Sequence, residues 1–395
     1  MSIFSSSKKL ETVLILDIGS GSVGGVFALI DPKQKKKPTI VHAIRADILY
    51  QQTLDGERFH QSMLEALKRV LSGLHELNFG QPTRVYCFLA APWYASQTRE
   101  IMLSRGTTFT FSKSFANALF EKEIRAFEQE HLAVFREKND DMRLFEKRIT
   151  DIRLDGVTLS EPFGKKAKEV SMSVFVAIAG EQLVHNIEYH INKFFHAPKV
   201  VFGSFQGAAH LTLRTLFPTE SNLLIADIGG EVTDMGFVRD DNIAETITFP
   251  IGKHDIVRRI AKQFSVTLHE AEALLSLYYR GALEKRFRTQ VERTVEYAQL
   301  MWIRAFKRAL LAKKESLLTI PEKMFLFSDV ELAQFYTDAC KHKEMKGILH
   351  SEKNKLVLSV QAPLFADRVR VPMSEARDPF LMLETTCVSL FSNML

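Results

Sequence analysis

The sequence predicts an α/β protein made of two related halves that face each other across a cleft, with a small α+β domain inserted between them. The first observation behind this prediction is an internal repeat. Residues 13–31 and 223–238 each run from an apolar strand through Asp-Ile-Gly and a few small residues into a second apolar strand. The second observation is the length of 395 residues, which suits two or more domains that share a cleft.

The composition is that of an ordinary soluble protein. Hydrophobic residues make up 46% of the chain and charged residues 25%, which allows a sizeable core. The net charge is only +5, so there is no electrostatic case for nucleic-acid binding. The first eleven residues are polar and lack a secretory segment, and no stretch approaches 18 apolar residues. Because the three cysteines (Cys87, Cys340 and Cys387) are far apart, we expect a protein of the reducing cytoplasm. The lack of a long apolar stretch predicts no direct membrane insertion.

The two repeats have the composition of phosphate-binding hairpins. Glycines let the backbone approach a ligand closely, so that successive N–H groups can point at an anion. An Asp at the end of the incoming strand can reach a magnesium ion through its waters. The alternative is two ordinary hairpins with glycine-rich turns. This alternative is weaker because the pattern occurs in two matched copies. The candidate residues are Asp17, Gly19, Ser20, Gly21 and Ser22 in the first hairpin, and Asp227, Gly229, Gly230, Glu231 and Thr233 in the second.

These residues resemble the motifs of a known superfamily. Asp17-Ile18-Gly19-Ser20-Gly21 is similar to the first phosphate motif of the actin, sugar-kinase and heat-shock-chaperone ATPases, and residues 227–234 are similar to the second. Within this superfamily the chain resembles the bacterial actin homologues FtsA (cell division) and, less closely, PilM (type IV pilus assembly). The resemblance implies duplicated ribonuclease H-like halves around a nucleotide cleft. It also implies ATP and Mg²⁺ as ligands, with metal-binding and catalytic roles for Asp17 and Asp227.

The elements before the second hairpin follow in order. Apolar residues at helical spacing predict a helix over residues 59–74. Residues 84–180 are predicted to form the inserted domain, with a strand at its start, a helix over 116–135 and a closing strand over 170–178. Within it, residues 154–170 resemble a segment of the extra domain of FtsA.

The second half continues with helices and one more strand. An apolar stripe predicts a helix over residues 256–264. Thr267 and Glu270 have the spacing of a capping box and predict the start of the next helix. A long helix is expected over 290–311, and an apolar strand over 324–327.

The tail is predicted to be a closing helix that packs back on the core. Interfacial helices carry cationic residues beside their apolar face, and the tail after Asp378 has no Lys or Arg; its apolar stripe is Phe380, Leu383, Cys387, Phe391 and Met394. The predicted boundaries are 1–83 for the beginning of the first half, 84–180 for the insertion, 181–220 for the rest of the first half, 221–377 for the second half and 378–395 for the closing helix.

Two further site residues come from the resemblance. In the superfamily a helix shortly before the second hairpin presents a catalytic polar residue to water, which implies Gln206; a polar residue at a helix start is the alternative. An Ala-Glu pair in the relatives holds the nucleoside, which implies Glu272, although a solvated helix glutamate is the more ordinary interpretation.

The sequence departs from the family at three places. Leu275 stands where the relatives have a lysine that helps to hold the nucleoside. Ser328 and Asp329 stand where two glycines lie against the adenine, so their side chains are expected to narrow that slot. Gly24 stands where actin has a phosphate-binding lysine.

The resemblance and its departures leave four functions open. The first is an FtsA-like scaffold that binds ATP and Mg²⁺, hydrolyses ATP weakly or not at all, and acts through self-association and partners of the division ring. The second is a PilM-like component of a pilus platform. The third is a binding module that no longer uses nucleotide, which the departures favour. A sugar-kinase-like enzyme is the fourth, for which no substrate base can be identified.

Overall fold

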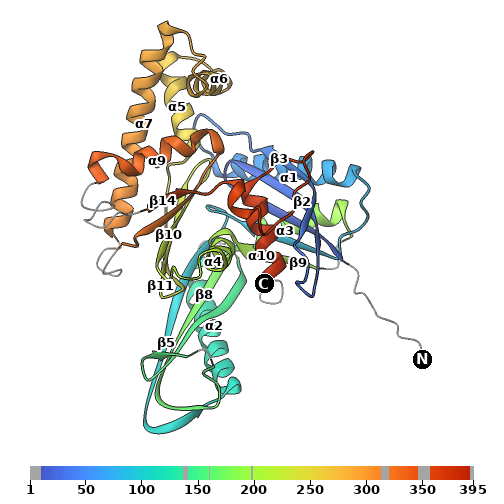
Figure 1. Cartoon of the computed structure of the whole chain (residues 1–395), viewed down its shortest axis with the longest axis vertical. Coiled ribbons are helices and arrows are strands. Elements are labelled where there is room, and N and C mark those ends of the chain that lie inside the picture. Colours follow the sequence, from blue (N-terminus) through green and yellow to red (C-terminus); the bar gives the residue numbers. More distant parts are fainter. Residues whose placement is uncertain are drawn as a thin grey trace.

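The computed structural model describes residues 10–136, 141–159, 161–196, 199–312, 320–345 and 356–391. Two five-stranded sheets form the cores of two halves, and a four-stranded sheet forms an inserted domain that extends away from them (Figure 1). The predicted α/β architecture of duplicated halves with a small α+β insertion is confirmed.

The first half is built on a sheet with the strand order β3-β2-β1-β4-β9. Its first three strands pair antiparallel, and the last two join the sheet in parallel. The strands are β1 (Glu11–Ile18), β2 (Ser22–Ile30), β3 (Thr39–Asp47), β4 (Arg84–Leu89) and β9 (Val200–Ser204), and the accompanying helices are α1 (Gly56–Glu76), α3 (Glu181–Phe194) and α4 (Phe205–Leu216).

The second half repeats this plan in the order β12-β11-β10-β13-β14, again with three antiparallel strands followed by two parallel ones. The predicted capping box is confirmed, since Thr267 and Glu270 each bond the backbone of the other. The strands are β10 (Leu223–Ile228), β11 (Thr233–Arg239), β12 (Asn242–Phe249), β13 (Lys323–Phe327) and β14 (Leu356–Ser359), and the α-helices are α5 (Lys253–Phe264), α6 (Leu268–Tyr279), α7 (Lys285–Ala312) and α9 (Ala333–Lys341).

The inserted domain begins later than the predicted boundary at residue 84. The strand Arg84–Leu89 belongs to the first sheet, where it lies between β1 and β9. Its residues from Val85 onward are all buried, as expected for a parallel strand covered on both faces. The insertion itself has the strand order β5-β8-β6-β7 and consists of β5 (Ala95–Phe111), α2 (Lys113–Arg136), β6 (Met142–Leu154), β7 (Val157–Thr158) and β8 (Lys165–Gly180).

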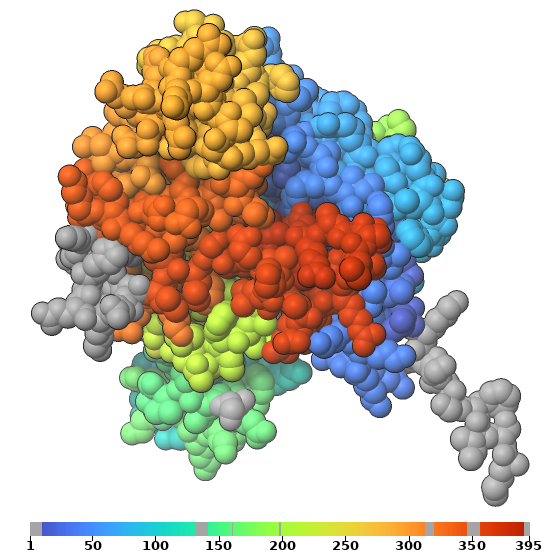
Figure 2. All heavy atoms as spheres, turned by 45° about the horizontal axis from the view of Figure 1, so that its top comes forward, coloured from blue at the N-terminus to red at the C-terminus, as the bar shows by residue number. Residues whose placement is uncertain are grey.

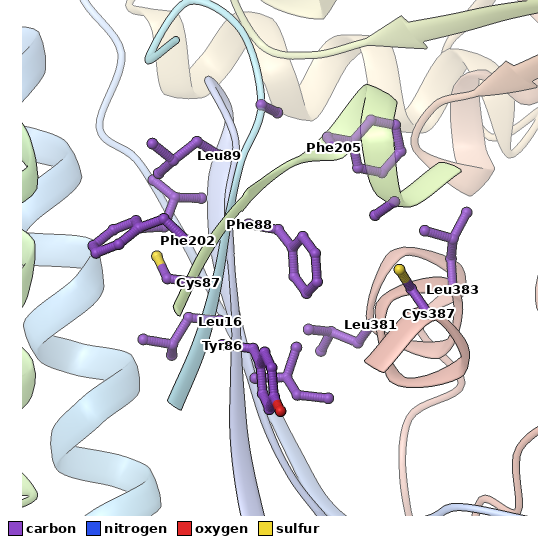
Figure 3. Close-up of a cluster of buried hydrophobic side chains, with 14 of the residues drawn as sticks. Leu16, Tyr86, Cys87, Phe88, Leu89, Phe202, Phe205, Leu381, Leu383 and Cys387 are labelled. Carbon is purple, nitrogen blue, oxygen red and sulfur yellow. The ribbon is translucent and has the colours of Figure 1, made fainter. Parts of the chain in front are cut away.

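The core of the first half packs on both faces of its sheet. Figure 3 shows Tyr86 and Phe88 of β4 on the face toward the last helix, α10 (Pro379–Phe391), and Cys87 and Leu89 on the opposite face. This alternation is the two-residue period of a strand. The opposite face is covered by α1, whose buried residues are Phe59, Met63, Leu64, Ala66, Leu67, Val70, Leu71 and Leu74.

The inserted domain is attached to both halves. Its Glu146 accepts hydrogen bonds from the Ser204 backbone N–H at 2.7 Å and from the Ser204 hydroxyl at 2.6 Å. Ser204 in turn caps α4, because its Oγ accepts from the Gly207 N–H. On the other side, Thr246 of β12 donates to the carbonyl of Ser96 at 3.0 Å. The insertion therefore connects the start of α4 to the edge of the second sheet.

The closing segment of the chain lies over the junction of the two halves in the space-filling view (Figure 2). Residues 381–389 of α10 are buried on all sides, and the helix contacts β1 and α4. The side chain of Phe391 and all of Met394 lie outside the described residues. Among the described helices, none is long and apolar enough to cross a membrane.

Candidate functional site

A cleft of about 470 Å³ lies where the two predicted hairpins meet. It is lined by nine of the residues that the sequence predicts for a nucleotide site, namely Asp17, Gly19, Ser20, Gly21, Ser22, Asp227, Gly229, Gly230 and Glu272. The other three predicted residues, Gln206, Glu231 and Thr233, do not line the cleft. The two Asp-Ile-Gly motifs are thus brought together by the duplicated fold.

The tips of the two hairpins are in direct contact. A Cβ built on Gly230 would lie 2.6 Å from the Cα of Gly21, so only glycine permits this approach. The N–H of Glu231 donates to the Ser20 hydroxyl at 3.2 Å, which joins one hairpin to the other. The halves therefore meet backbone to backbone at the floor of the cleft.

Three backbone N–H groups remain available at this floor. Within the hairpins, the N–H groups of Gly19 and Gly229 donate to carbonyls of their own turns. Among the described residues, the N–H groups of Ser20, Gly21 and Gly230 find no acceptor, and all three residues line the cleft. Backbone donors without acceptors that line one cleft are a feature of an anion site, so the residues present fit a phosphate group.

Asp17 is already paired with an arginine that the sequence did not single out. The Arg45 guanidinium donates from Nη2 to Asp17 Oδ2 at 2.8 Å, from Nη1 to the Ser22 hydroxyl at 2.9 Å, and from Nε to Asp378 Oδ2 at 2.6 Å. Burial lowers the pKa of Arg45, but the neighbouring Asp378 and Asp17 carboxylates outweigh this and raise it. The guanidinium is therefore a permanent positive charge at the first hairpin.

Asp227 forms no ion pair with a basic side chain among the described residues. Burial first, and then the nearby Asp234, Asp17 and Asp329 carboxylates, raise its pKa well above the usual range. Burial also raises the pKa of Asp17, although Arg45 opposes this shift. The two aspartates that the repeat makes equivalent thus have different electrostatic environments.

A divalent metal does not fit this arrangement between the two aspartates. Asp17 offers its Oδ2 to Arg45, which occupies the oxygen that would otherwise accept from a water of the metal. Mg²⁺ needs carboxylates that accept its coordinated waters in a nearly octahedral arrangement. A guanidinium at hydrogen-bond distance from Asp17 competes with that arrangement both sterically and by charge.

Gln206 does not face the cleft. Its side chain is fully buried, and its Nε2 donates to the carbonyl of Asp234 at 3.2 Å. It fits against β11 because Gly236 has no side chain: a Cβ there would lie 2.4 Å from Gln206 Oε1. The polar residue at a helix start is therefore a packing group in this structure, with Ser204 as the actual cap of α4.

Thr233 and Glu231 also point into the protein. Thr233 donates its hydroxyl to the carbonyl of Ile251 and accepts from the indole N–H of Trp302. Glu231 accepts hydrogen bonds from His254 at 2.9 Å and from both terminal nitrogens of Arg258 at 2.6 and 2.8 Å. These two residues hold the second hairpin in place rather than contact the cleft.

Charged side chains of the second half also line the cleft. Lys253 pairs with Asp329 at 2.6 Å, and both lie along the cleft beside Glu272, Leu275 and Tyr279. Asp329 stands at one of the positions where the resemblance predicts glycine, and its carboxylate is held by this ion pair. Sequence reasoning missed Lys253, Arg45 and Asp378. The glycine pair inside β2 was an available signal, because glycine in a strand often marks the close approach of another group.

Comparison with known proteins supports the fold. No family model matches the chain, and no curated protein matches its sequence. The structure of a PilM–PilN type IV pilus biogenesis complex superimposes with a TM-score of 0.61 at 15% identity, covering 97% of this chain and 98% of that chain. The ethanolamine utilization protein EutJ of Carboxydothermus hydrogenoformans gives a TM-score of 0.42 at 12% identity, covering 96% of this chain and 89% of that one. A Bacteroides thetaiotaomicron protein described as having an actin-like ATPase fold and unknown function gives 0.39 at 11% identity, covering 98% of this chain and 100% of that one. The chain has the actin-like ATPase fold, with a structural resemblance to PilM.

Proposed function

We propose that this chain is an actin-like scaffold that binds the phosphates of ATP in its cleft and acts through a protein partner, as PilM is paired with PilN. The observation that carries this proposal is the likeness to the PilM–PilN structure over nearly the full length of both chains. We favour a pilus-type assembly over the division ring, because the likeness to the PilM–PilN structure covers 97% of this chain and 98% of that chain.

The nucleotide part of the proposal is supported by the floor of the cleft. Three backbone donors and Arg45 line the cleft, and Glu272 lines it as well, where it would accept from a ribose hydroxyl. ATP at this position would contact both hairpins and so stabilise the closed arrangement of the halves. In this proposal the nucleotide is a structural clamp and the chemistry of hydrolysis is secondary.

Hydrolysis is expected to be slow. A water must be oriented toward the γ-phosphate for phosphoryl transfer, and Gln206, the residue proposed for that role, donates to the Asp234 carbonyl instead. We expect steady-state phosphate release well below about 1 per second, the lower range of ordinary enzymes. Faster release that Asp227→Ala abolishes would contradict this expectation, whereas Gln206→Ala should leave the slow rate unchanged.

The proposed protein partner is tested by gel filtration. We expect the purified chain to form a stoichiometric complex with the PilN-family protein of the same genome on gel filtration. The matched comparison is a division-ring protein of the same genome under the same conditions. Binding of the division-ring protein without the PilN-family protein would contradict the pilus assignment and favour the FtsA-like role.

A further inference from the structure

We propose that Arg45 is the resident cation of the cleft and that the site therefore binds nucleotide phosphates without a divalent metal. This inference rests on the proposed binding of ATP in the cleft and deepens it. It concerns a residue outside both phosphate hairpins, which the family motifs do not include.

The position of Arg45 follows from strand register. Asp17 of β1 pairs with Gly24 of β2, and Gly24 pairs with Arg45 of β3, so the three residues form a row across the sheet. The Arg45 side chain crosses over Gly24 to reach Asp17. A Cβ built on Gly24 would lie 2.7 Å from Arg45 Nη2 and 2.9 Å from its Cζ. The absence of a side chain at Gly24 is thus what gives the guanidinium its place.

The guanidinium is held from three sides and still has donors to offer. Asp17, Ser22 and Asp378 each take one N–H, at 2.8, 2.9 and 2.6 Å. The ring of Phe380 lies under it, with 5.6 Å between the ring centroid and Cζ. A guanidinium carries five N–H groups, so two remain for a ligand. Arg45 also lines the same cleft as the unpaired N–H groups of the hairpins.

This arrangement performs the two tasks that a metal and a lysine would otherwise share. The guanidinium lies between the Asp17 and Asp378 carboxylates and offsets part of their repulsion of a phosphate at the floor of a partly buried cleft. The remaining donors match the geometry of phosphate oxygens, for which arginine is well suited. A second cation approaches from the opposite half, because Lys253 Cε lies 3.1 Å from the position of a Cβ on Gly21. Protein cations thus face the anion site from both halves.

The test compares ATP binding by the full chain in magnesium and in excess EDTA, measured by isothermal titration calorimetry. For the natural protein we expect the same dissociation constant in both buffers, within about twofold. For Arg45→Gln we expect binding in EDTA to weaken by about tenfold or more. Because this substitution frees Asp17, magnesium should restore part of the affinity, so that binding becomes metal-dependent. Arg286→Gln, which removes an exposed arginine on α7, is the matched control and should bind as the natural protein does.

The outcomes separate this inference from the proposed function. ATP binding by the natural protein only in magnesium would overturn the role of Arg45 and leave the proposed nucleotide site standing. An absence of ATP binding in either buffer would overturn both. The comparison of buffers needs no variant, so it decides the question even if Arg45→Gln fails to fold.

Discussion

Replacing Gly230 with alanine is expected to force the two halves of the cleft apart and to lower the free energy of unfolding by about 3 kcal/mol, the upper range for overpacking a well-packed contact. The added Cβ would lie 2.6 Å from the Cα of Gly21, 2.6 Å from His254 Cε1 and 2.7 Å from the carbonyl oxygen of Ser20. Two of these three atoms belong to the backbone of the opposite half, so no side-chain movement relieves the clash. The measurement is urea unfolding followed by circular dichroism.

Gly56→Ala is the matched control for this prediction. Gly56 begins α1, and a Cβ built there has no neighbouring atom within 4 Å. Alanine at this position should leave stability unchanged or raise it by up to about 1 kcal/mol, since it lowers the entropy of the unfolded chain. Equal effects of the two substitutions would show that the hairpin contact contributes nothing to the closed arrangement.

Replacing Glu231 with alanine is expected to cost about 3–5 kcal/mol, because it leaves the largely buried guanidinium of Arg258 without its carboxylate and the buried His254 without its acceptor. The Glu231 carboxylate is 3% exposed and accepts from His254 and Arg258. Arg258 also donates from Nε to the carbonyl of Gln51 in the first half, at 2.7 Å. Loss of Glu231 therefore loosens a connection between the halves as well as the second hairpin.

The same carboxylate predicts a pH dependence. Burial raises the pKa of Glu231, but the hydrogen bonds from His254 and Arg258 outweigh this and hold the pKa below its ordinary value of 4.5. A carboxylate with a lowered pKa in the folded state contributes stability that is fully present above the ordinary value and is lost as the pH falls through the folded one. Urea unfolding of the natural protein should therefore show a loss of stability below about pH 4.5 that is smaller in Glu231→Gln. An identical acid profile in both proteins would show that other carboxylates govern this range.

The fold could be predicted from the sequence because its signals are local and occur twice. An apolar strand, Asp-Ile-Gly and a second apolar strand fall within 20 residues in each half, and neighbouring strands of a hairpin must pair. The helical stripe from Phe59 to Leu74 and the capping box at Thr267 are equally local, and the structure contains both. The predicted start of the insertion is too early, because nothing local in the apolar strand Arg84–Leu89 indicates which sheet it joins.

The sequence by itself determined that two Asp-Ile-Gly hairpins face a common cleft, whereas only the tertiary structure decided what surrounds them. Arg45 reaches Asp17 across Gly24, and it meets Asp378 from a segment 333 residues away. Gln206 turns toward β11 because Gly236 leaves space there. Both outcomes depend on strand register and on side-chain directions between distant segments, which no spacing within one segment specifies. Which cation lies in this cleft therefore depends on the folded chain, whereas the repeat alone predicts the cleft.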